Sequence, residues 1–289
     1  MKLPFTSSRT SSEPVVLVPN QWNGSVQQYY HFLLGYLAPI HRWITHHPGK
    51  RIAVRDCGPM NRWFDVLRPE TDIEIMTVGD VLHVLAGDLQ PHRVLRGMDL
   101  PTEFRALDLR SFATFTRRIA EKRVEATPSP VDVLVTDRAS SDDFFASPAA
   151  EWPESGSQKR SVPNLTKVVS TWTDLKVHIL DGATCGIYEQ ILLHGTAKVL
   201  VGQHGAGLTN MLWMAPGSAV VEILPPMPDD ATDIFGNLAR ALGLHHFTVT
   251  QNSVHSSVKI EELSTAVRAG LITVHSRESS SLGPGTIDR

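Results

Sequence analysis

The feature that most constrains this 289-residue chain is the stretch from Ala197 to Pro226, which has the pattern strand, glycine loop, helix, turn and strand. The apolar, β-branched run at 197–201 is typical of a parallel strand covered on both faces. Glycines then interrupt it, a helix is expected over 207–214, and another apolar strand follows at 219–224. A strand that ends in glycines and opens a helix directs unpaired backbone N–H groups at one spot, which suits a phosphate group.

The glycine loop also has a simpler interpretation, because glycines at a strand–helix turn often serve only to allow a positive φ. The loop is not a Walker A sequence, since no Gly-Lys-Ser/Thr follows, and Asn210 stands where a GxGxxG pattern would have its third glycine. His204 and Asn210 flank the glycines, and a histidine ring and an amide at such a loop favour ligand binding over a plain turn.

The rest of the chain alternates between strand-like and helix-like segments, which indicates an α/β fold. Strands are expected at 15–19, 51–54, 72–76, 131–136, 167–169, 176–180, 197–201, 219–224 and 246–250. Helices are expected at 25–43, 107–123, 186–194, 207–214, 231–242 and 259–270. Residues 80–85 fit either element. Ser25 is a candidate cap for the first helix, Pro39 would kink or end that helix, and Gly243 has the place of a helix-ending glycine.

The segment 126–130, in which two prolines flank a serine, is the best candidate for a linker. We therefore predict an N-terminal α/β domain at 1–127, a C-terminal α/β domain at 128–275, and a disordered tail at 276–289, which is rich in Ser and Gly. A single merged α/β domain is the alternative, because each half is small.

Composition excludes several classes of partner. The net charge of −3 gives no global attraction to nucleic acid or an anionic membrane. Two cysteines, Cys57 and Cys185, make no disulfide framework, and the 13 histidines lack metal-ligand spacing. The N-terminus has no apolar core of signal-peptide length, and no run approaches the ~20 apolar residues of a membrane span. We expect a cytoplasmic protein without a transmembrane segment; peripheral membrane contact and the oligomeric state stay open.

Several segments together resemble a known family. They are HGAGLTN at 204–210, MAPG at 214–217, VEI at 221–223, IYEQI at 187–191, the strand at 131–136 with Arg138 after it, and YHFL at 30–33. In sequence and order they are similar to the signature of glycosyltransferase family 61. The resemblance is specific over about 131–226 and patchy before that.

The resemblance implies an inverting glycosyltransferase of GT-B architecture, in which two Rossmann-like α/β/α units face a cleft. The N-terminal unit would bind the acceptor, and the C-terminal unit would bind the donor. The donor would be a nucleotide-diphosphate sugar, of the UDP type in this family, and the acceptor a hydroxyl group of a glycan or small molecule in surface-polysaccharide synthesis. No cofactor is implied beyond this co-substrate, and no metal is strictly required.

The same resemblance suggests the residues of the donor site. They are Arg138, His204, Gly205, Ala206, Gly207, Thr209, Asn210 and Glu222. Arg138 and the loop N–H groups would stabilise the departing diphosphate; a surface ion pair with a nearby aspartate is the alternative for Arg138. Glu222 lies mid-strand, where a carboxylate needs a partner, and is expected to accept ribose hydroxyls or to pair with a cation of the sheet. Glu189 is expected to support the loop from behind.

His31 is the candidate general base, because the pKa of a histidine lies near neutral pH. A core-edge histidine is the alternative, and His204 is a second catalytic candidate. In the family an aspartate often follows this histidine, whereas Gly35 has that place here. The alternative function is therefore a catalytically silent module that binds a nucleotide sugar or a partner. A SAM methyltransferase would carry its glycines near the first strand, and a nucleotide-sugar epimerase would need no acceptor.

Overall fold

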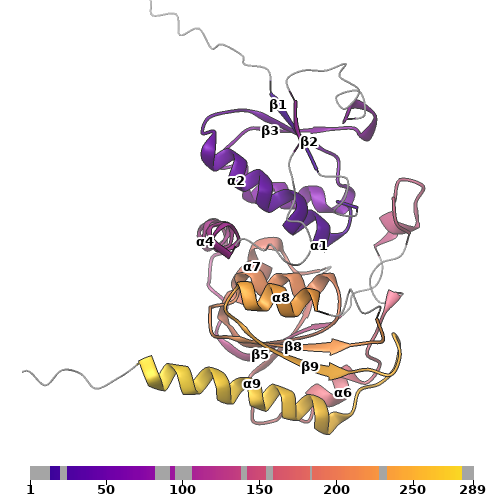
Figure 1. Ribbon diagram of the computed structural model, residues 1–289, viewed down its shortest axis with the longest axis vertical. Coiled ribbons are helices and arrows are strands. Elements are labelled where there is room, and N and C mark those ends of the chain that lie inside the picture. The colour runs from indigo at the N-terminus through magenta and orange to yellow at the C-terminus, as the bar shows by residue number, and fades with distance from the viewer. Residues whose placement is uncertain are drawn as a thin grey trace, which may run out of the picture.

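The computed structural model describes residues 14–19, 25–81, 92–94, 106–137, 142–153, 159–182, 184–227 and 233–281. Within these residues the chain forms two parallel sheets flanked by helices, which confirms the predicted α/β class (Figure 1). Along the longest axis of the molecule, helical layers separate the two sheets.

The N-terminal sheet has the strand order β3-β2-β1-β4 in the described part of the chain. Its strands are β1 (Val15–Val18), β2 (Ile52–Arg55), β3 (Ile73–Met76) and β4 (His92–Val94). Neighbouring strands pair in parallel, with Val16 opposite Ala53 and Leu17 opposite Val54. The sequence predicted the first three strands but not β4, because His-Arg-Val is too short and too polar to form an apolar run.

The first predicted helix is a continuous helical segment in three parts. They are α1 (Tyr29–Phe32), the π-helix η2 (Leu33–Leu37) and α2 (Ala38–His46). Ser25 caps a turn before the helix rather than the helix itself, since its Oγ accepts from the backbone N–H of Gln27. Pro39 does not end the helix; it lies in the first turn of α2, directly after the wider π-helical turn, where the missing N–H of proline is tolerated.

A 3₁₀ helix, η3 (Gly58–Val66), follows β2. Residues 78–81 are helical, and the rest of the ambiguous segment at 80–85 lies outside the described residues.

The C-terminal sheet has the order β6-β5-β7-β8-β9 within the described residues. Its strands are β5 (Val131–Asp137), β6 (Val177–Asp181), β7 (Ala197–Gln203), β8 (Ala219–Leu224) and β9 (His245–Thr250), again paired in parallel. The predicted strand at 167–169 is wrong: these residues belong to the helix α6 (Leu165–Val169). Leu165 and Val168 are both buried at helical spacing, and a short apolar run cannot distinguish the two elements.

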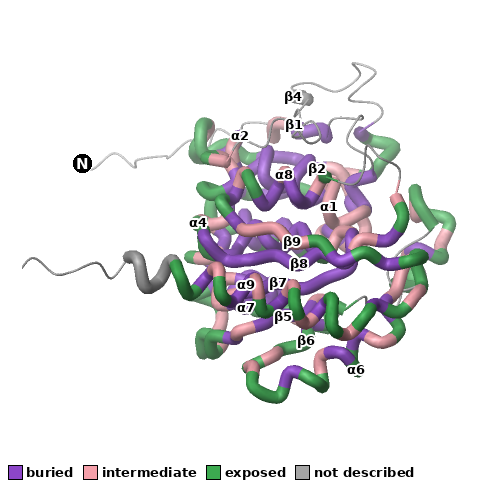
Figure 2. The backbone as a smooth tube through the Cα atoms, turned by 60° about the horizontal axis from the view of Figure 1, so that its bottom comes forward, coloured by how far each residue is buried: buried purple, intermediate pink, exposed green. Residues whose placement is uncertain are grey.

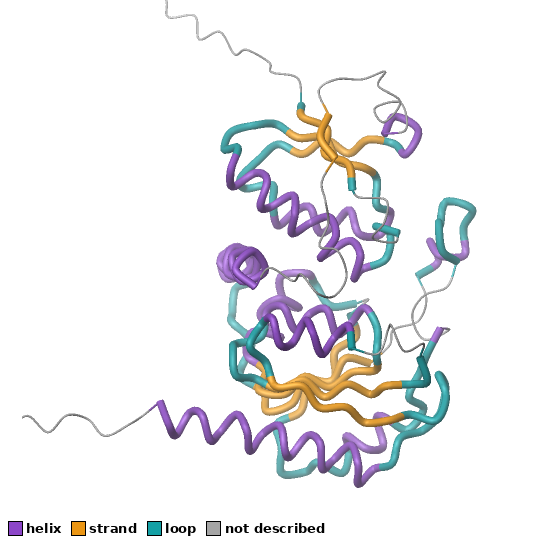
Figure 3. The backbone as a smooth tube through the Cα atoms, viewed as in Figure 1, coloured by secondary structure: helices purple, strands orange, loops and turns teal. Residues whose placement is uncertain are grey.

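Helices cover both faces of this sheet (Figure 3). The helices α7 (Ile187–Thr196), α8 (Ile234–Ala241) and the 3₁₀ helix η5 (Ala206–Trp213) lie on the side of the N-terminal sheet, and α6 and α9 (Ile260–Ser281) lie on the other side. A short 3₁₀ helix, η4 (Asp143–Ala146), follows β5. Gly243 ends α8 with a φ of +65°, as predicted. Residues 276–281 were predicted to be disordered but form the end of α9; residues 282–289 lie outside the described residues.

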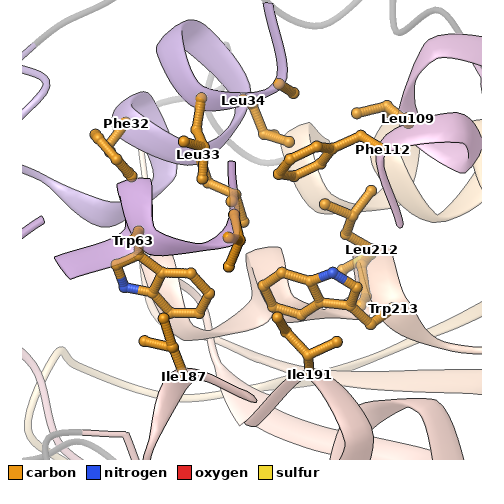
Figure 4. Packing of buried hydrophobic residues seen from close by; sticks show 14 of the residues in the cluster. Phe32, Leu33, Leu34, Trp63, Leu109, Phe112, Ile187, Ile191, Leu212 and Trp213 are labelled. Carbon is orange, nitrogen blue, oxygen red and sulfur yellow. The ribbon is translucent and has the colours of Figure 1, made fainter. Parts of the chain in front are cut away.

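The two sheets share one hydrophobic core. The helix α4 (Ala106–Arg123) packs against α2, α7 and η5, and buried side chains from all these helices meet in the layer between the sheets (Figure 4). Trp63 and Trp213, from opposite halves, stack with ring centroids 5.6 Å apart. A second cluster lies between the C-terminal sheet and α9, so the inner strands β5, β7 and β8 are buried on both faces, whereas the edge strands β6 and β9 are partly exposed (Figure 2). The predicted boundary at residues 127 and 128 falls between the sheets, but whether it separates two domains stays a prediction.

Residues 142–153 form a second connection between the halves. Glu151 forms an ion pair with Arg55 and accepts a hydrogen bond of 2.5 Å from the hydroxyl of Ser25. The side chain of Gln27 donates to the backbone oxygen of Ala149 and accepts from the backbone N–H of Glu151. The segment that follows β5 is therefore attached to the N-terminal half.

The shared core predicts a large effect of truncating Trp213, which is 1% exposed and donates its indole N–H to Thr116. Trp213→Ala should lower the free energy of unfolding by about 3–5 kcal/mol, measured by urea titration. Trp152 is 54% exposed and gives the matched control, for which Trp152→Ala should change stability by less than about 0.5 kcal/mol. Equal losses in the two variants would contradict the shared core.

Stability should also fall between pH 6.5 and pH 4, because burial lowers the pKa of His194 to about 4. In this range the unfolded chain binds a proton at this histidine and the folded protein does not. The free energy of unfolding therefore decreases as the pH drops through this window. Burial lowers the pKa of His41 to about 4 as well. Urea titrations at pH 7, 5.5 and 4.5 should show a shallower decline in His194→Leu than in wild type. The exposed His46 gives the control variant His46→Leu, which should keep the wild-type slope.

Candidate functional site

The candidate site lies at the carboxyl edge of the C-terminal sheet. The strand β7 ends at Gln203, and the glycine loop at 204–207 leads into η5. Since the strands are parallel, the end of β5 lies at the same edge. Arg138, which follows β5, lies outside the described residues. The start of α1 lies over η5, because the hydroxyl of Tyr29 donates a hydrogen bond of 2.5 Å to Oδ1 of Asn210.

The loop is held in place by its backbone. The N–H of His204 donates to the oxygen of Ile223 at 2.8 Å, and the guanidinium of Arg160 donates to the oxygen of His204 at 2.8 Å. Gly205 has a φ of +149°, which L side chains rarely adopt. Gly202 has no room for a Cβ, which would collide with Oγ1 of Thr136. The glycines therefore serve backbone conformation and close approach, and these requirements also leave the loop able to bind a ligand.

Exposure differs along the loop. Gly205 and Ala206 are half-buried and Gly207 is exposed, so this part of the backbone can be reached by a ligand. Thr209 and Asn210 are buried. Asn210 is bonded to Tyr29, whereas Oγ1 of Thr209 has no hydrogen-bond partner among the described residues. Of the predicted loop residues, 205–207 are thus placed for direct contact, and Thr209 and Asn210 lie beneath them.

His204 and Glu222 form the centre of the site. Nδ1 of His204 is 2.5 Å from one carboxylate oxygen of Glu222, and Nε2 of His246 is 2.8 Å from the other. The Glu222 side chain is fully buried, and burial alone would raise its pKa. The hydrogen bonds from the two histidines outweigh this effect and lower the pKa, so that Glu222 is ionised at neutral pH.

This arrangement corrects the expected contact of Glu222 with a ribose. Both of its oxygens already have histidine partners, and none of its side chain is exposed. The alternative was that Glu222 pairs with an arginine or lysine of the sheet, but its partners are histidines. Glu222 therefore supports the site from within the sheet.

His31 lies on the helix that faces the loop. It is half-buried in α1, and its ring meets the edge of Tyr30 at 5.2 Å between centroids. Tyr30 packs against Phe235 at 5.9 Å, and Phe235 packs against His204 at 5.0 Å. Aromatic contacts therefore join the helix of His31 to the ring of His204, and the structure brings both predicted histidines to one region.

Glu189 lies in the first turn of α7, beside Cys185. Burial and the nearby carboxylate of Glu189 raise the pKa of the Cys185 thiol to about 12. Among the described residues we find no hydrogen bond from Glu189 to the 204–210 loop, so its supporting role stays a prediction.

Three residues of the site were missed from the sequence. Tyr29 has the spacing of an ordinary core position, and Arg160 lies in a polar loop without any pattern. His246 is one of two adjacent histidines on a strand, and only the pairing of β9 with β8 shows which of them reaches Glu222. Arg160 is half-buried, and burial lowers its pKa. Within the described residues, it places a cation beside the glycine loop.

The described residues also bear on metal binding and on membrane insertion. No group of three or more His, Cys, Asp or Glu side chains is arranged there to hold a metal ion. The same residues contain no helix that is both long and apolar enough to cross a membrane.

Comparison with known proteins gives two matches. The family model for glycosyltransferase 61 matches residues 29–221, a range that runs from α1 into β8 and includes the glycine loop. A xylan glycosyltransferase of Arabidopsis thaliana, MUCI21, is 42% identical over 52 residues. That match covers 18% of this chain and only 10% of the length of the relative.

Substitution by alanine is predicted to lower stability clearly at Gly202 and only slightly at Gly207. Gly202→Ala would place a Cβ against Thr136 and 3.0 Å from Leu208, so it should lower stability by about 1–3 kcal/mol. Gly207→Ala would meet no atom closer than 3.7 Å, and its cost should stay below about 0.5 kcal/mol. Thermal unfolding of both variants measures the difference, and an equal effect at both positions would show that the loop packs differently.

Proposed function

This chain belongs to the glycosyltransferase 61 family, and we propose that it transfers a sugar from a nucleotide-diphosphate sugar to a hydroxyl group of an acceptor. The observation that carries the proposal is the reachable backbone at 205–207, at the carboxyl edge of a parallel sheet, beside a buried His204–Glu222 pair and facing α1. A loop of this kind binds phosphate groups through backbone N–H groups.

We propose a GT-B arrangement in which the C-terminal half holds the donor and the N-terminal half holds the acceptor. Two parallel sheets with helical layers between them support this arrangement. The stacked pair Trp63–Trp213 fills the middle of the layer, so the ligands would bind at its edge. At that edge, Tyr29 of α1 meets Asn210 of η5.

The donor side must stabilise negative charge on the departing diphosphate. As the acceptor oxygen attacks the anomeric carbon from the opposite face, the bond from that carbon to the phosphate oxygen breaks and the electron pair stays on the phosphate. Preorganised N–H groups at 205–207 and the guanidinium of Arg160 would stabilise that charge. Arg138 is proposed as a further phosphate contact. A UDP sugar as donor and inversion at the anomeric carbon are proposed from the family resemblance.

The acceptor side must remove a proton from the attacking hydroxyl. We propose His31 for this role because its helix faces the glycine loop through the contacts of Tyr29 and Tyr30. A glycan of the polysaccharide type is the proposed acceptor class, in keeping with the xylan glycosyltransferase relative. The cytoplasmic location stays a prediction.

A second candidate is a module that binds the nucleotide sugar without turnover. It is favoured by Gly35, which is buried in η2 and supplies no carboxylate at the position where the family often has one. The two candidates share the donor site and differ in catalysis.

Binding and turnover should therefore be measured separately. Calorimetric titration with UDP, GDP, CMP and dTDP in EDTA should show binding of one diphosphate nucleotide, and release of that nucleotide from its sugar conjugates measures turnover. His31→Ala should keep the affinity for the nucleotide and lower turnover about 10²-fold or more. His46→Ala, an exposed histidine on α2, is the matched control and should keep the wild-type rate.

The outcomes distinguish the candidates. Binding without nucleotide release in the wild type supports the silent module. Equal rates in His31→Ala and His46→Ala remove His31 from the mechanism. Absence of binding by every nucleotide and its sugars would contradict both functions.

A further inference from the structure

A hydrogen-bonded chain of three side chains crosses the C-terminal sheet. Glu222 is on β8, which lies between β7 and β9; His204 follows β7, and His246 is on β9. In the strand register Glu222 lies opposite Gly202 and Thr248, so the two histidines reach it from the diagonal positions of the neighbouring strands. Exposure of the side chains rises from 0% for Glu222 to 5% for His204 and 20% for His246.

The burial of Glu222 fixes the orientation of both rings. A fully buried carboxylate is tolerated only when hydrogen-bond donors satisfy it. Each oxygen has one imidazole nitrogen within 2.8 Å, so Nδ1 of His204 and Nε2 of His246 carry the donated protons. The two hydrogen bonds thereby fix the ring of His204 at the start of the glycine loop.

Other groups define the surroundings of this chain. Phe235 of α8 packs its ring edge against His204 at an interplanar angle of 74°. A Cβ added to Gly236 would collide with the carboxylate of Asp233 and come within 3.2 Å of Nδ1 of His246, so both groups lie over Gly236.

Two cations complete the charged surroundings. Arg240 lies 3.7 Å from Asp233, and Arg160 donates to the backbone oxygen of His204. The carboxylate of Glu222 thus accepts from Nε2 of His246, and a cation lies beside the glycine loop.

We propose that His246 is a positioning residue for the transfer and that it acts on His204 through Glu222. This proposal rests on the proposed function. The hydrogen bond from Nδ1 of His204 to Glu222 holds the His204 ring at the start of the glycine loop, whose N–H groups would stabilise the negative charge that the phosphate oxygen gains when its bond to the sugar breaks. His246 keeps Glu222 ionised and in place.

The test compares three variants on the same strand. His246→Leu removes the donor to Glu222, whereas the side-chain amide of His246→Gln supplies a donor that does not titrate. His245→Leu alters the adjacent residue, for which the described residues show no hydrogen bond to Glu222, and serves as the matched control. Initial rates at neutral pH and the KM for the nucleotide sugar are measured for each protein.

The expected result is specific to a positioning role. His246→Leu should lower kcat about tenfold or more and change KM less than threefold, because the interaction with the leaving group forms in the transition state. His246→Gln supplies a donor to Glu222 again and should restore kcat to within about threefold of wild type, and His245→Leu should retain the wild-type kcat.

A second measurement does not depend on turnover. The ¹H and ¹⁵N chemical shifts of the His204 ring in the free protein report the hydrogen bond from Nδ1 to Glu222. Loss of the His246 donor strengthens that hydrogen bond, so the Nδ1–H resonance should move downfield in His246→Leu and stay at the wild-type position in His246→Gln.

Unchanged kcat in His246→Leu, or an unchanged Nδ1–H resonance of His204, would overturn the positioning role. If no nucleotide binds and none is released, the proposed function fails instead, and the Nδ1–H resonance alone then decides whether His246 positions His204.

Discussion

A single buried carboxylate organises the functional edge of this protein. Glu222 stays ionised inside the sheet because two histidines from the neighbouring strands donate hydrogen bonds to it. Burial raises the pKa of Glu222, but these hydrogen bonds lower it by more, so the net shift is downward. The same hydrogen bonds hold the ring of His204 at the start of the glycine loop. Loop, ring and carboxylate are thus one unit, in which the strand register places each group before any ligand binds.

The shared core holds the helix α1 of the N-terminal half against this unit. The layer of helices between the sheets is packed with large apolar side chains, and it places α1 directly over η5 through Tyr29 and Asn210. Residues 142–153 add polar contacts from Glu151 and Gln27 to the same end of the molecule. A site formed between halves can be preorganised when the halves are packed together in this way.

The sequence predicted the α/β class, most strands and the glycine loop, because each depends on local chemistry such as apolar runs and turn glycines. It failed at α6, where three apolar residues fit either element, and at β4, where the strand has no apolar pattern. The role of Glu222 was assigned to a ligand because its true partners lie on other strands. Arg160 and His246 gave no local signal, since only tertiary structure brings them to the loop.

The stacking of Trp63 on Trp213 bears on how the chain folds during synthesis. The N-terminal sheet and its helices leave the ribosome first, yet the apolar side chains that they direct at η5 and α7 have no cover until those elements have also been made. Contacts between residues so distant in sequence slow folding and leave apolar surface exposed until they form. The N-terminal half therefore exposes apolar surface during synthesis until η5 has also left the ribosome.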